Sequence, residues 1–165
     1  MKVTADTKWA EFESVDPYIT EDTRKDLNKA AQDAIRIYGE LTIDEFFGVV
    51  GGDMSILGNT DEPTVLQMYW MRGFEQYCKQ LTEATEKLKV PSDPNKEQAY
   101  QRGCVELSAQ EHMLIFMRAY FGLHSFYEAG KRTMGEYLTA RKDEYNKGMV
   151  QYNFEQAQKE KFKKR

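Results

Sequence analysis

Apolar residues recur at three- and four-residue steps along most of this chain, the pattern of helices that bury one face. The clearest run starts at Thr20 and carries Leu27, Ala30, Ala31, Ala34, Ile35 and Tyr38. Two further long runs follow. The pattern therefore predicts three long helices, over residues 20–38, 60–89 and 133 to about 159.

Helix starts are marked by capping boxes, in which a Ser or Thr side chain and a Glu three residues later satisfy each other's backbone amides. Such boxes begin at Thr42, Ser108, Ser125 and Thr133. No stretch shows the alternation of a strand. Together these patterns predict an all-α, single-domain helical bundle of about seven helices spanning residues 1–165, with a basic, frayed C-terminal end over 155–165.

The second long run has apolar residues spaced alternately by four and three, which is a heptad seam. Inside one small domain, such a seam predicts an internal antiparallel helix pair. The 108–121 segment is apolar on nearly all sides and is predicted to be central. Its Met113 and Met117 also allow a groove that adapts to varied partners.

The apolar positions that we single out for partner contact lie on two helices. Four belong to the heptad seam and three to the final helix, where the long amphipathic stretch is free to dock on another protein. The alternative is that the seam residues form the core. The partner-binding candidates are Trp70, Phe74, Tyr77, Leu81, Tyr145, Met149 and Tyr152.

Composition narrows the possible classes of protein. A length of 165 residues is typical of one domain with a real core, and a net charge of −4 opposes binding to nucleic acid. No apolar run is long enough to cross a membrane. Two cysteines and a polar beginning predict neither a disulfide framework nor a secretory signal, so a reducing, cytoplasmic location is expected.

Residues that could carry chemistry are few. Only His112, His124, Cys78 and Cys104 offer nitrogen or sulfur ligands, and no two have the spacing of a zinc site. The glycine-containing loop over 48–58 lacks the residues of a phosphate or calcium loop. We therefore expect no metal, no cofactor and no enzymatic activity; a small enzyme or metal protein using His112 or His124 is kept as an alternative.

One short segment occurs twice. Residues 39–47 and 130–138 align a Gly, a Thr and a Glu, with matched apolar positions after them. Two capped helix starts converge on this pattern without any duplication, which is the interpretation that we favour.

Three stretches carry a resemblance to a known family: LTIDEFF, DEPTVLQMYWMRGFEQYC and YFGLHSFYEAGKRTMGEYLTARKDEYNKG. They resemble small helical proteins from the tail-gene clusters of gut bacteriophages and prophages, the tail assembly chaperones. The similarity covers residues 41–78 and 120–148 and lies in helix-start chemistry. It brings no catalytic residues.

The resemblance implies a cytoplasmic protein that holds the long helical tape-measure protein while the tail tube assembles around it. Its partners would be that protein or other tail proteins, and a homo-oligomer is left open. The first alternative is a head-to-tail connector or adaptor, a permanent part of the virion that forms a ring of many copies.

Overall fold

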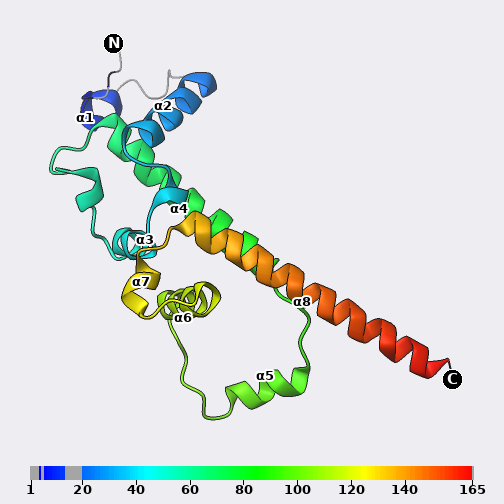
Figure 1. The fold of residues 1–165 in the computed structure, drawn as a ribbon. Helices are drawn as coiled ribbons and strands as arrows, with labels where there is room; N and C mark the ends of the chain where they lie inside the picture. Colours follow the sequence, from blue (N-terminus) through cyan, green and yellow to red (C-terminus); the bar gives the residue numbers. More distant parts are fainter. Residues whose placement is uncertain (1–3, 5, 14–19, 165) are drawn as a thin grey trace.

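The computed structural model describes residues 4, 6–13 and 20–164, which fold into helices and connecting loops (Figure 1). No strand lies in this part of the chain, so the predicted all-α class is confirmed. Two 3-10 helices, η2 (Tyr38–Glu40) and η3 (Ser55–Leu57), join the longer elements. The α-helices are α1 (Trp9–Glu13), α2 (Glu21–Ala34), α3 (Ile43–Val50), α4 (Val65–Glu86), α5 (Pro94–Gln101), α6 (Ala109–Phe121), α7 (Phe126–Gly130) and α8 (Met134–Lys163).

The helices begin where local chemistry predicts. Complete capping boxes open α3 at Thr42, α6 at Ser108 and α8 at Thr133. At Ser125 the box is half formed, because Glu128 accepts from the amide of His124 instead. A further box opens α4 at Thr64 with Gln67, a few residues later than the predicted start near residue 60.

Two pairs of helix starts are joined by isolated antiparallel bridges, Lys8 with Thr64 and Thr42 with Thr133. In each pair, the backbone amide of the first residue of one helix donates to the backbone carbonyl of the residue before the N-cap of the other helix. These hydrogen bonds are 2.8–2.9 Å long. These amides have no partner within their own helices. The repeated segments of the sequence thus meet, α3 against α8, and satisfy each other's free donors.

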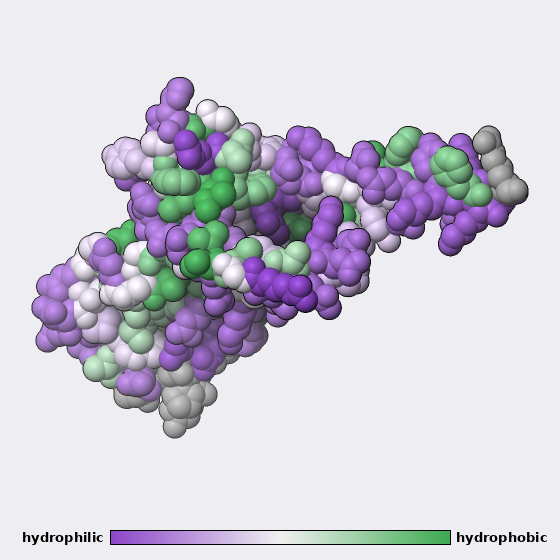
Figure 2. Space-filling model, turned by 90° about the horizontal axis from the view of Figure 1, so that it is seen from below, coloured by the Kyte–Doolittle hydropathy of each residue, from purple (hydrophilic) through white to green (hydrophobic). Residues whose placement is uncertain are grey.

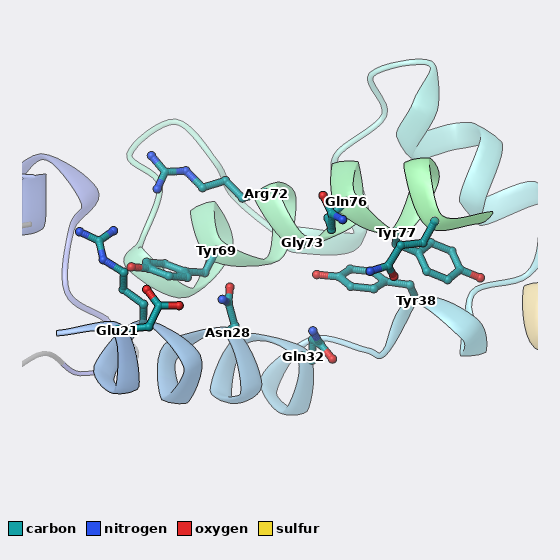
Figure 3. Close-up of a pocket in the computed structure, with 11 residues that line it drawn as sticks. Glu21, Asn28, Gln32, Tyr38, Tyr69, Arg72, Gly73, Gln76 and Tyr77 are labelled. Carbon is teal, nitrogen blue, oxygen red and sulfur yellow. The ribbon is translucent and has the colours of Figure 1, made fainter. Parts of the chain in front are cut away.

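Helices α2 and α4 form the most extensive helix pair, and they run in the same direction. Figure 3 shows Tyr69 of α4 near Glu21 at the start of α2, and Tyr77 near Tyr38, beyond the end of α2. The predicted antiparallel pair is therefore wrong. Residues 35–64 carry the chain back through α3, which allows parallel packing.

The core is concentrated before residue 82. Phe12, Leu41, Ile43, Val65 and Trp70 are fully buried there, in the space between α1, α2, α3 and α4. The later part of the chain adds only a few buried apolar side chains, namely Met117, Ala129, Met134, Tyr137 and Ala140.

Helix α6 is peripheral, so the prediction of a central helix is wrong. Among its side chains only Met117 is buried, and Ile115 is 45% exposed. One face packs on α3, α7 and α8, and the remaining apolar residues stay at the surface because no further element covers them. Residues 87–108, which we call the arm, loop out between α4 and α6 and carry α5, none of whose residues is buried (Figure 1).

Helix α8 starts against η2 and α6 and then projects from the body (Figure 1). It continues to Lys163, through the basic segment predicted to be frayed, and its side chains beyond residue 149 are exposed or half-buried. Residue 165 lies outside the described part. None of the described helices combines the length and apolar character needed to cross a membrane.

Candidate partner-binding surfaces

The heptad-seam residues lie inside the protein. Trp70 is 0% exposed, Phe74 and Leu81 are also buried, and Tyr77 is half-buried. The rings of Trp70 and Phe74 stack at 5.5 Å, and the ring of Tyr38 packs on both. The seam is therefore largely core, the alternative that the sequence left open, although Tyr77 and Phe74 each also line a groove at the surface.

Two reciprocal hydrogen bonds lock the chain after α2 onto α4. The Tyr38 hydroxyl donates to the carbonyl of Trp70 at 2.9 Å, and the Trp70 indole donates to the carbonyl of Arg36 at 2.7 Å. Gly73 makes room for this contact, since a Cβ there would lie 2.1 Å from the Tyr38 oxygen. Burial raises the pKa of Tyr38 to about 12, against a smaller opposing effect of Gln32.

A groove of about 570 Å³ runs beside this contact, between α2 and α4. Figure 3 shows Asn28 and Gln32 of α2 on one side of it and Arg72 and Gln76 of α4 on the other. Its amide and guanidinium groups offer hydrogen bonds, and three tyrosine rings add apolar surface in similar measure.

The three candidates on α8 share one face. Tyr145, Met149 and Tyr152 are spaced by four and three residues, which places them within about 60° around the helix. All three are half-buried. The arm lies close by, because a Cβ on Gly148 would meet Val90 at 2.6 Å. We call these three residues the Tyr145–Tyr152 face.

A second apolar stripe on α8 was not among the predicted sites. Val150 is 71% exposed and Phe154 is 59% exposed, one turn apart, and Ala157 continues the line. This stripe lies about 140° around the helix from the Tyr145–Tyr152 face. Figure 2 shows the projecting helix at the right as largely hydrophilic, with apolar residues near its end. The four-residue spacing of Val150 and Phe154 is visible in the sequence, but spacing alone does not show which stripe of α8 the body leaves uncovered.

A polar link holds the base of α8 to α6. The Tyr120 hydroxyl donates to Asp143 at 2.6 Å, and Lys147 lies 3.0 Å from the same carboxylate. The hydrogen bond from Tyr120 lowers the pKa of Asp143 and, conversely, raises the pKa of Tyr120. The link fixes the direction in which α8 leaves the body.

An apolar groove of about 510 Å³ opens between the end of α3 and the middle of α4. Val50, 55% exposed, stands at its edge, and Met54, Met71 and Phe74 lie in its wall. Glu75 and Lys79 supply charges at its rim. We call it the α3–α4 groove. The sequence did not reveal it, because its walls come from helices that meet only in the fold.

The histidines and cysteines do not gather. His112 and His124 are exposed at the start of α6 and after its end, Cys104 is exposed in the arm, and Cys78 is half-buried on α4. Burial raises the pKa of the Cys78 thiol, and the nearby Glu75 adds to this effect. Within the described residues, no three His, Cys, Asp or Glu side chains are placed to hold a metal ion.

Comparison with known proteins adds no relative to this description. No protein-family model, no curated protein and no solved structure matches the chain.

Proposed function

We propose that this chain is a non-catalytic binding protein of bacteriophage tail morphogenesis, which holds the helical tape-measure protein during tail assembly. The proposal begins from the resemblance of residues 41–78 and 120–148 to tail assembly chaperones. The observation that carries it further is the projecting helix α8, with the Tyr145–Tyr152 face on one side.

Exposed apolar side chains support a binding role. Apart from Ile37 and Val50, the large hydrophobic residues that are exposed in the described part lie beyond residue 99, on the arm, α6, α7 and α8. Val150 and Phe154, one turn apart on α8, form a small exposed apolar patch, and contiguous patches of this kind mark interaction sites. A helical client would cover such surface through residues spaced by three and four along its own sequence.

The Tyr145–Tyr152 face suits varied helical sequences. Methionine adapts its shape at little cost, and tyrosine offers a large apolar ring with a polar end. A chaperone that holds successive segments of one long client needs this tolerance more than it needs a single deep pocket. We expect contact at this face to be of moderate strength and reversible.

A pull-down from cells that produce the phage or prophage tests the proposal. The tagged chain should recover one very long helical protein, identified by mass spectrometry, and should be absent from finished particles. The double variant Tyr145→Glu/Met149→Glu should lose the client, while Asn146→Glu, on an exposed position of the same helix, should keep it. Equal recovery by both variants, or no long client with the wild-type chain, would refute the proposal.

The second candidate function is a connector or adaptor between head and tail. A ring of many copies needs two different surfaces on one chain, and the exposed end of α8 and the α3–α4 groove are two different apolar surfaces. Particles that contain the chain at a fixed stoichiometry would favour this function over the chaperone.

A further inference from the structure

We infer that the chain associates with itself head to tail, with the end of α8 from one copy docked in the α3–α4 groove of the next. The end of α8, residues 150–164, is called the tip below. The contact goes beyond the proposed function and does not depend on any client. It rests on exposure, shape and charge within one chain.

The tip is a helix without support. Past Gly148, no described residue of α8 is buried. A helical segment of about 15 residues is only marginally stable in water by itself. Val150 and Phe154 stand on it as exposed apolar side chains, in the spacing by which a helix enters a groove.

The α3–α4 groove is the proposed binding site for the tip. At about 510 Å³ it can take a phenyl ring and its neighbours, and its methionine-lined wall can adjust to them. Val50 at its edge is as exposed as Phe154 is on the tip. Figure 1 shows the tip pointing away from α3, so a chain cannot fill its own groove.

Charge favours a second copy as the occupant. Residues 1–63, which supply α3 and the turn after it, carry 14 acidic and 6 basic side chains, a net charge of −8. Residues 155–164 carry Lys159, Lys161, Lys163 and Lys164 against Glu155 and Glu160, a net charge of +2. The rim of the groove itself carries one charge of each sign. The attraction therefore acts between the acidic N-terminal part of the chain, which contains the groove, and the basic tip, and it steers copies head to tail.

The two surfaces differ, so the contact is heterologous. Repeating it leaves a free tip at one end and a free groove at the other, and the assembly closes into a ring or grows as a filament. A symmetric contact between two tips would instead stop at a dimer. Like charges on both tips oppose that arrangement.

Sedimentation of the purified full-length chain over a range of concentrations tests the inference. The wild type should form species larger than a dimer, and raising the salt should weaken them. Phe154→Glu and Val50→Glu should each raise the apparent dissociation constant at least about tenfold. Asn153→Glu, exposed beside Phe154 and equal in added charge, should associate like the wild type. Val50 and Phe154 are both exposed, so circular dichroism should show the same helix content in these two variants as in the wild type.

Mixing the two variants gives the sharpest result. Phe154→Glu keeps an intact groove and Val50→Glu keeps an intact tip, so the mixture should form a 1:1 heterodimer and grow no further. A wild type that stays monomeric at every concentration would overturn the inference. So would a mixture without heterodimers, or a Phe154→Glu variant that behaves like Asn153→Glu. Loss of the client in the pull-down has no bearing on these results, so the two failures can be told apart.

Discussion

Thr42 and Thr133 face each other across an antiparallel bridge, each at the start of its own helix and each in a complete capping box. Ile43 donates its amide to Arg132 at 2.9 Å, and Met134 donates to Leu41 at 2.8 Å. Side chains and backbone together therefore satisfy free amides at both helix starts. The bridge joins the N-terminal core to the base of α8.

Removing either cap should destabilise the whole fold. Thr42→Ala and Thr133→Ala should each lower the free energy of unfolding by about 1 kcal/mol, the usual cost of losing an N-cap oxygen. Urea unfolding measures this loss. Thr42→Ser and Thr133→Ser keep the oxygen and should lose less. If the alanine variants unfold at the wild-type urea concentration, the boxes add nothing to stability.

Gly73 should be needed for the contact between Tyr38 and Trp70. Gly73→Ala should destabilise the protein by roughly 1–3 kcal/mol, since the added methyl group displaces a buried hydrogen-bond donor. Gly48→Ala is the matched control, because its Cβ would come no closer than 3.8 Å to Asp53. That variant should gain up to about 1 kcal/mol from better helix propensity.

A double-mutant cycle isolates this contact. Tyr38→Phe removes the oxygen that the new methyl group would strike, so Gly73→Ala should cost less in the Tyr38→Phe background than in the wild type. Strictly additive free energies of unfolding would mean that the two positions are not coupled.

Stability should fall in acid through the capping carboxylates. Burial opposes ionisation of Glu45, but hydrogen bonds from Thr42 and the neighbouring Arg36 outweigh it and lower the pKa. The same balance, with Arg132 and Thr133, lowers the pKa of Glu136. The stability that these two carboxylates contribute is fully present above their unfolded-state pKa, near 4.5. It is lost as the pH falls through their lower pKa values in the folded chain.

Thermal unfolding from pH 7 to pH 3 measures this loss, and Glu45→Gln is the informative variant. Gln67 already serves in the box that opens α4, so a glutamine can keep the hydrogen bonds. The variant should therefore show a flatter pH dependence than the wild type. An equally steep dependence would place the acid sensitivity elsewhere.

Stability should also fall in strong base through Tyr38. Its pKa is about 12 in the folded chain against 10.0 for a free phenol, because burial disfavours the charged form. The stabilisation is complete below pH 10 and is lost as the pH rises from about 10 toward about 12. Other tyrosines also have raised pKa values, so the ultraviolet titration of Tyr38→Phe is subtracted from that of the wild type. The difference should be one tyrosine that ionises near pH 12, and a difference centred near pH 10 would contradict the burial of this hydroxyl.

The sequence by itself determined which elements form. A cap needs only a side-chain oxygen and amides three residues away, so Thr42, Ser108 and Thr133 could be recognised without any tertiary contact. Asp93 likewise caps α5, with Pro94 as its first residue. The all-α class followed from the same local chemistry and from the helical period of the apolar residues.

Only the tertiary structure decided which apolar faces are buried. Trp70 and Phe154 are both large apolar residues on amphipathic helices, yet one lies in the core and the other on the projecting tip. Periodicity shows that a face is apolar but does not show what covers it. The parallel course of α2 and α4, the meeting of Thr42 with Thr133 and the α3–α4 groove all depend on residues far apart in the chain, and long-range packing set them.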